Sequence, residues 1–190
     1  MTIENRFVKD LKPILFDQNW AKTAPDFKIY SVERGIKFKD SLRYDETVIY
    51  PRLLGQEFPK TKGHEHPKEY RELIKVLKGE AVFLLQNDQK DKIEDIYFIK
   101  VKRGQAIISP TGYSHTTINA SKKDLKIGTW IEDVSPSNYS NIMKHQGFGY
   151  YLTLSGWQKN KKYKTLPKLR EEKPLKSYPK NLDFLKPDCC

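Results

Sequence analysis

Three of the four histidines of this chain lie within residues 61–119, a stretch rich in β-forming residues and divided by glycine and proline. Its first part reads TKGHEHPKEYRELIKVLKG and its last part reads GQAIISPTGYSHTTIN. In a strand, alternate residues point to the same side, so His64 and His66 would direct both imidazoles into one cavity. A helix would separate the two rings. The pattern therefore favours short strands around a shared cavity.

A carboxylate and a third imidazole extend this pair to a set of possible metal ligands. We expect residues 67–71 to bend the chain so that Glu72 enters the next strand, and His115 follows a Pro-x-Gly turn. The histidine pair alone could be two solvated side chains. Three imidazoles with a carboxylate, however, suit a first-row divalent ion, with adjacent coordination positions left open for substrate. We predict a metal site formed by His64, His66, Glu72 and His115.

Turn residues recur along the chain at the spacing of short antiparallel strands, which predicts a sandwich or barrel. Gly79 divides the longest β-forming run and marks a tight bend. A helix over residues 70–79 is the competing interpretation, because Leu73, Val76 and Leu77 also fit one helical face. The expected strands lie at residues 28–39, 47–54, 72–85, 93–101, 105–109, 115–119, 125–131 and 147–154, with a polar hairpin tip at residues 87–92.

The chain divides into an N-terminal arm, a barrel and a C-terminal tail, for which we predict residues 1–27, 28–157 and 158–190. Prolines interrupt the helical pattern of the arm, whose apolar residues should pack on the barrel or on a second subunit. The tail mixes prolines with lysines and should be extended, either wrapping the barrel or mobile.

Composition excludes several classes of protein. With 37% hydrophobic and 31% charged residues the chain has a soluble globular composition. No apolar run approaches the roughly 20 residues of a membrane helix, and no signal-peptide core is present, so we expect a cytoplasmic protein. The two cysteines, Cys189 and Cys190, are adjacent and cannot link distant parts of a fold. We expect two exposed thiols there rather than a lipidation site.

The net charge of +11 raises nucleic-acid binding as a possible function. Residues 158–190 contain ten Lys and Arg against four Asp and Glu, so the tail supplies +6 of this charge. We therefore expect a solvated basic tail and no nucleic-acid partner. The same charge would favour a small acidic substrate.

The histidine segment resembles the two motifs of the cupin family. The first, G-x5-HxH-x3,4-E-x6-G, is similar to residues 63–79, with a longer gap before Glu72. The second, G-x5-PxG-x2-H-x3-N, fits at Gly104, Pro110, Gly112, His115 and Asn119. Membership implies an all-β fold, a single double-stranded β-helix barrel (jelly roll), with a metal ion in its mouth.

Within the cupins, the chain resembles the cupin-type glucose-6-phosphate isomerases of archaea and some bacteria. Thr-Lys-Gly directly before the paired histidines, a Thr-Val-Ile strand from Thr47, and a strand and loop ending in Tyr139 are similar to that family. The resemblance implies that the metal ligands are His64, His66, Glu72 and His115 and that Thr47, Thr61, Gly63 and Tyr139 bind the substrate. Lys62 and Arg52 could add charge for its phosphate, whereas His145 is expected on the surface.

The resemblance implies an enzyme of glycolysis and gluconeogenesis that interconverts glucose 6-phosphate and fructose 6-phosphate. One divalent ion per subunit would polarise the sugar carbonyl, and iron(II) is expected, with manganese, nickel, cobalt or zinc as alternatives. Glu72 is the candidate catalytic base of a cis-enediol route, and a hydride shift is the competing route. A homodimer is also implied.

Two other classes of function remain open. One is another metal cupin, such as a dioxygenase or decarboxylase, and a dioxygenase would be expected to show oxygen uptake and an iron requirement. A sugar-binding cupin without turnover would bind the ligand but release no product.

Overall fold

The computed structural model describes residues 1–66, 70–89 and 92–187, which form thirteen strands and five short helical segments. The strands are β1 (Thr2–Phe7), β2 (Lys28–Lys39), β3 (Leu42–Ile49), β4 (His64–Glu65), β5 (Glu72–Lys78), β6 (Glu80–Gln89), β7 (Lys92–Lys102), β8 (Ala106–Ser109), β9 (Ser114–Ile118), β10 (Leu125–Glu132), β11 (Tyr150–Thr153), β12 (Gly156–Lys159) and β13 (Arg170–Glu172). The helical segments are α1 (Val8–Leu11), η1 (Lys12–Ile14), α2 (Gln18–Thr23), α3 (Ser140–Lys144) and η2 (Asp183–Leu185). Within the described residues, no helix has the length and apolar character needed to cross a membrane.

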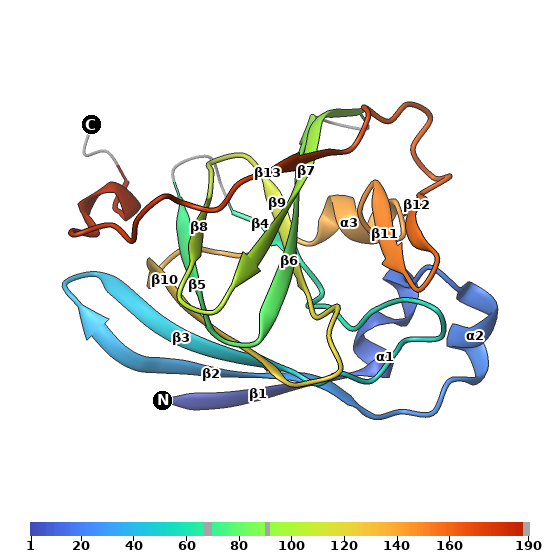
Figure 1. Ribbon diagram of the computed structural model, residues 1–190, viewed down its shortest axis with the longest axis horizontal. Helices are drawn as coiled ribbons and strands as arrows, with labels where there is room; N and C mark the ends of the chain where they lie inside the picture. The colour runs from blue at the N-terminus through green and yellow to red at the C-terminus, as the bar shows by residue number, and fades with distance from the viewer. Residues whose placement is uncertain (67–69, 90–91, 188–190) are drawn as a thin grey trace.

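Two sheets lie one above the other and enclose a single main core (Figure 1). One sheet has six strands in the order β1-β2-β3-β10-β5-β8, and the other has five in the order β13-β7-β6-β9-β4. Buried residues of both sheets belong to this core, among them Val76 of β5, Ile127 of β10 and Phe83 of β6. A separate hairpin of β11 and β12 lies at one end, beside the N-terminal helices (Figure 1).

The segment for which two interpretations were open forms two strands. β5 ends at Lys78 and β6 begins at Glu80, so the prediction of a bend at Gly79 is confirmed and the helix over residues 70–79 is wrong. Gly79 has a φ of +83°, in the left-handed region where a side chain would be strained. Leu73 and Ile74 are both buried although they point to opposite faces of the sheet. Burial on both faces removes the alternation of polar and apolar residues that would have identified a strand.

The N-terminal residues complete one edge of the six-stranded sheet. β1 pairs with β2, and the helical segments that follow bury Val8, Leu11, Ile14 and Leu15 in the core. These short helices were not predicted, and neither was α3. The apolar residues of the arm thus pack on the barrel of the same chain. The division into arm, barrel and tail stays a prediction.

The tail runs along edges of both sheets and then over an outer face. β13 pairs in parallel with β7, and farther along the Leu175 N–H donates to the Ala106 carbonyl of β8 at 2.9 Å. Leu182 and Leu185 are buried with Leu73 on the outer face of the six-stranded sheet. The tail therefore covers two strand edges that would otherwise be exposed. Cys189 and Cys190, part of the bend after His66 and part of the hairpin tip lie outside the described residues.

Candidate metal centre and substrate cavity

A cavity opens between the two sheets and encloses, with its mouth, about 780 Å³ of empty space. Every site residue predicted from the sequence lines it: His64, His66, Glu72, His115, Thr47, Thr61, Gly63 and Tyr139.

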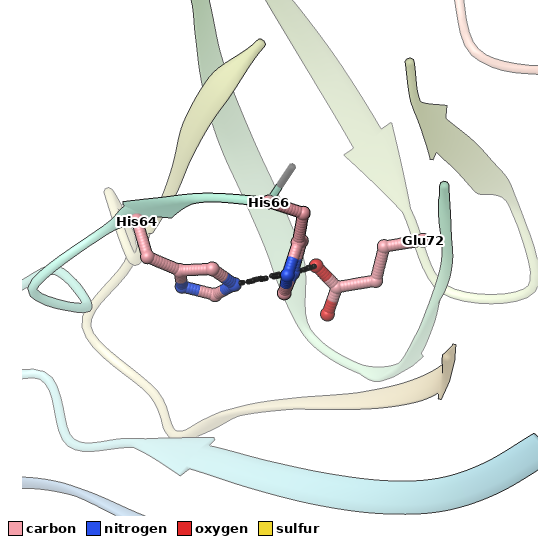
Figure 2. Close-up of side chains that lie close together, drawn as sticks. All are labelled: His64, His66 and Glu72. Carbon is pink, nitrogen blue, oxygen red and sulfur yellow. Dashed lines mark hydrogen bonds and ion pairs between the residues drawn. The ribbon is translucent and has the colours of Figure 1, made fainter. Parts of the chain in front are cut away.

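The three imidazoles and Glu72 converge on one point of this cavity. His64 Nε2 lies 2.7 Å from His66 Nε2, and the ligand atoms of His64, His66 and Glu72 all lie within 4.8 Å of one another (Figure 2). Glu72 Oε2 lies 2.8 Å from His115 Nε2, 3.3 Å from His66 Nε2 and 3.7 Å from His64 Nε2. Figure 2 shows the histidine pair approaching from β4 and Glu72 from the facing strand β5.

These separations fit a bound divalent ion. Two adjacent ligand atoms, each about 2.1 Å from an octahedral ion, lie about 3 Å apart. The four ligand atoms show separations of 2.7, 2.8, 3.3 and 3.7 Å, so small adjustments bring them to one ion. Nitrogen with one carboxylate oxygen is also a donor set typical of first-row ions. The residues present therefore fit the metal ion that the sequence predicts.

Supporting hydrogen bonds orient two of the imidazoles. The Ser109 hydroxyl lies 3.0 Å from Nδ1 of His115, and the Ser135 hydroxyl lies 2.9 Å from Nδ1 of His66. The Pro136 carbonyl also lies 3.0 Å from Nδ1 of His66. Because each Nδ1 is engaged outside the cluster, each Nε2 points into it. Such contacts commonly fix ring orientation in metal sites.

The electrostatics of the cluster suit metal ligands. Burial lowers the pKa of His64 to about 4, so this imidazole is neutral at pH 7 with a lone pair to offer. Burial alone would raise the pKa of Glu72, but its contacts with His115, His64 and His66 outweigh burial and hold this pKa well below its ordinary value. Glu72 is therefore a carboxylate at neutral pH. Neutral imidazole and ionised carboxylate are the protonation states that bind metal ions.

Local backbone geometry positions the paired histidines against His115. β4 and β9 are antiparallel, with His64 opposite His115. Gly63, directly before β4, has a φ of +73°. A Cβ at this position would lie 2.5 Å from a Phe148 ring carbon and 2.9 Å from the His115 carbonyl oxygen, so a glycine is required for this close approach.

The residues predicted to bind substrate surround this cluster. The Tyr139 ring lies 6.1 Å from the His64 ring, and Lys62 Nζ lies 4.9 Å from the Tyr139 ring centre. The Thr61 hydroxyl accepts a hydrogen bond from the Thr117 N–H at 3.0 Å, so it also holds the segment before β4 against β9. Thr47 lies on β3, with its neighbour Ile127 on β10.

Several charged residues of the cavity were missed by the sequence analysis. They come from the first three strands: Glu4, Arg6, Arg34, Arg43 and Asp45, and the neutral Tyr30 lies among them. The alternation of Tyr30, Val32 and Arg34 along β2 was the available signal, since it places an arginine on the same face as core residues. Arg52, by contrast, is exposed and stacks on Phe27, and it does not line this cavity.

His145 and Asn119, both considered in the sequence analysis, are buried outside the cavity lining. His145 is buried and stacks on Tyr163 with ring centres 4.3 Å apart, so the prediction of a surface histidine is wrong. It follows the short helix α3, which the sequence analysis did not predict, and this helix carries it inward. Asn119, the last residue of the second motif, is fully buried and donates to the carbonyls of Ile49 and Lys123. It holds the turn before β10 rather than lining the cavity.

A barrel of two sheets with three histidines and a glutamate in its mouth defines the cupin class. An oxalate oxidase in complex with the substrate analogue glycolate is similar in structure, with a TM-score of 0.50 and 14% sequence identity over 62% of this chain and 58% of that chain. This similarity shows the fold, and the all-β cupin barrel predicted from the sequence is confirmed.

Sequence comparisons identify the family within this class. The family model described as glucose-6-phosphate isomerase (GPI) matches residues 5–168, and the chain belongs to that family. The glucose-6-phosphate isomerase of Thermococcus litoralis is 33% identical over 62% of this chain and 63% of its own length. That of Pyrococcus horikoshii is 35% identical over 60% of this chain and 61% of its own length. The chain thus spans less than two thirds of the length of these relatives.

Proposed function

We propose that this protein is a metal-dependent aldose–ketose isomerase that interconverts glucose 6-phosphate and fructose 6-phosphate. The observation that carries the proposal is the convergence of three imidazoles and Glu72 on one point, inside a cavity that hydroxyl-bearing and cationic side chains also line. Membership of the glucose-6-phosphate isomerase family supports the choice of reaction.

We assign the metal ion to His64, His66, Glu72 and His115. A divalent ion held there would polarise the carbonyl and stabilise negative charge on the neighbouring sugar oxygen. Iron(II) is our first candidate, and manganese, nickel, cobalt and zinc are the alternatives, since cavity ligands of this type accept each of them. The supporting hydrogen bonds from Ser109 and Ser135 hold two rings in orientation.

Glu72 is the proposed catalytic residue. Its Oε2 contacts the imidazoles of His115 and His66. Figure 2 shows the second carboxylate oxygen turned away from His64 and His66. We propose that this second oxygen takes the proton from C2 of the open-chain aldose while O1 gains a proton, which gives the cis-enediol. It then returns the proton to C1 while the O2 hydroxyl loses its proton, so that C2 becomes the carbonyl. The low pKa of Glu72 keeps it ready to accept a proton but makes it a weak base. A hydride shift between the two carbons, which needs no base, is the competing route.

The isotope content of the product distinguishes these two routes. Isomerisation in deuterated water would introduce deuterium at the transferred position if Glu72 carries the proton and exchanges it with solvent. A hydride shift would give product without solvent-derived deuterium.

The other predicted contacts are assigned to the body of the substrate. Thr47, Thr61, Gly63 and Tyr139 line the same cavity and offer hydroxyl or N–H donors for a phosphate or for sugar hydroxyls. We also propose that the protein is a homodimer and that it acts in the cytoplasm.

A coupled assay tests the proposed function. Purified protein is supplied with fructose 6-phosphate before and after treatment with a chelator, and each candidate ion is then added back in turn. We expect glucose 6-phosphate to form, to stop forming after chelation and to return with iron(II) or a substitute. Oxygen uptake without isomerisation would indicate another metal cupin, and sugar-phosphate binding without product would indicate a binding protein.

A further inference from the structure

Four cationic side chains line the cavity: Arg6, Arg34, Arg43 and Lys62. They differ in how fully carboxylates compensate them. Arg34 pairs with both Glu4 and Asp45, at 2.8 and 3.1 Å. Arg43 likewise pairs with two carboxylates, those of Asp45 and Asp133, at 2.9 and 2.6 Å. The charges of these two arginines are therefore neutralised within the cavity wall.

Arg6 is compensated less completely. It lies on the edge strand β1, opposite Tyr30 of β2, and pairs with Glu4 Oε2 at 3.0 Å. The same carboxylate also pairs with Arg34, so Arg6 has only a share of one negative charge. The Arg6 side chain keeps 37% of its surface exposed and has donors beyond the one used by Glu4.

Lys62 faces the same part of the cavity from the loop before β4. Its ammonium lies over the Tyr139 ring, and within the described part of the chain it forms no ion pair with a carboxylate. Its backbone N–H donates to the Tyr30 hydroxyl at 3.3 Å. Tyr30 thus connects the strand of Arg6 to the loop of Lys62.

The Tyr30 hydroxyl adds a neutral donor between the two cations. Burial raises the pKa of Tyr30 to about 12, so the hydroxyl keeps its proton at neutral pH. The contact with the Lys62 N–H uses the hydroxyl oxygen as acceptor. Its own proton is then available to a ligand in the cavity.

We propose that Arg6 and Lys62, together with the Tyr30 hydroxyl, hold the phosphate group of the substrate and give the site its preference for phosphorylated over neutral sugars. The inference rests on the proposed function. It keeps Lys62, which the sequence already offered for the phosphate, and adds Arg6 and Tyr30, which the sequence analysis did not name. The Tyr139 ring lies between Lys62 and the histidine cluster, since it contacts the Lys62 ammonium and also lies next to the His64 ring. A phosphate held by Arg6 and Lys62 would therefore lie in the same cavity as the metal ligands, with the Tyr139 ring next to both Lys62 and His64.

The test compares Arg6→Gln and Lys62→Gln with Arg52→Gln, which removes an exposed arginine outside the cavity. All are measured as metal-loaded protein. We expect the KM for fructose 6-phosphate to rise about tenfold to a hundredfold in the two cavity variants with kcat changed far less, as for loss of a charge-assisted hydrogen bond. Activity on unphosphorylated fructose should not change, and Arg6→Lys should restore part of the affinity. Arg52→Gln should behave as the unaltered protein.

Calorimetric titration with inorganic phosphate separates this inference from the proposed reaction. We expect weaker phosphate binding in both cavity variants and unchanged binding in Arg52→Gln. If the unaltered protein does not isomerise fructose 6-phosphate but loses phosphate binding on Arg6→Gln, the reaction is wrong and the phosphate site stands. If phosphate binding is absent from the unaltered protein, or equal in it and in both cavity variants, the inference is overturned. Glu4 keeps its pair with Arg34 in Arg6→Gln, so this variant should fold.

Discussion

His115 Nε2 and Glu72 Oε2 lie 2.8 Å apart although the two residues belong to different sheets. His115 is on β9 of the five-stranded sheet and Glu72 is on β5 of the six-stranded sheet. The proposed metal centre therefore joins the two layers of the barrel at its mouth. A ligand that binds the folded state but not the unfolded state stabilises the folded protein by mass action.

Metal removal should lower the stability of the protein. At a free metal concentration of one hundred times Kd, the expected loss in free energy of unfolding is about 2.7 kcal/mol. Denaturant unfolding with and without chelator measures it. His115→Ala should abolish the difference in free energy of unfolding between the two conditions. His145→Gln, which changes the histidine outside the cavity, should leave that difference unchanged. Equal stability of both forms of the unaltered protein would contradict a shared metal centre.

Ser109→Ala should weaken metal binding while leaving all four proposed ligands in place. The Ser109 hydroxyl contacts Nδ1 of His115 at 3.0 Å, and loss of such a supporting contact typically costs about 10–100-fold in metal affinity. Competition with a chelator of known affinity measures the change. Ser41→Ala, which removes an exposed hydroxyl bonded to Glu132, is the matched control and should leave affinity unchanged.

Gly63→Ala should destabilise the fold more than Gly104→Ala does. Both glycines have positive φ, +73° and +90°, so both substitutions carry backbone strain of about 1–2 kcal/mol. Only at Gly63 would the added Cβ collide with Phe148 and the His115 backbone, while at Gly104 nothing lies within 4 Å. Overpacking adds about 1–3 kcal/mol. Chemical denaturation of both variants measures the difference, and equal losses would show that the neighbours of Gly63 yield.

Acid should release the tail from β7. A hydrogen bond from Arg170 is the main cause that lowers the pKa of Asp95 below its ordinary value of 3.8. A carboxylate whose pKa is lower in the folded state stabilises it above the unfolded pKa, and this contribution is lost as pH falls through the folded pKa. The contribution is therefore present at neutral pH and disappears below about pH 4.

Limited proteolysis of the tail measures this release. Asp95→Asn should expose the tail at pH 7 as much as acid does in the unaltered protein, and the two proteins should become alike at low pH. Glu171→Gln removes a pair with Lys100 in which both side chains are more than half exposed, so it should have little effect. A tail equally resistant in Asp95→Asn and in the unaltered protein at pH 7 would contradict the role of Asp95.

Most strands of the barrel and the histidine cluster could be predicted from the sequence because their signals are local. β1, β12 and β13 were not predicted, and the strand expected at residues 47–54 lies instead at Leu42–Ile49. Gly79 and Gly104 mark turns where the backbone requires positive φ, and strand alternation places His64 and His66 on one side. The short N-terminal helices and α3 could not be predicted, since they have three to six residues and owe their stability to packing of residues such as Leu11 and Ile142 in the core.

Sequence by itself determined the fold class, the family and the set of residues proposed as metal ligands, because motif spacing and strand periodicity are local properties of the chain. The tertiary structure decided which other charges share the cavity with them. Arg6 lies at the far edge of the six-stranded sheet from β5, and only the pairing of β1 with β2 and the curvature of the sheet bring it to the same cavity as Glu72. Proximity across a sheet depends on strand order, which no local pattern encodes.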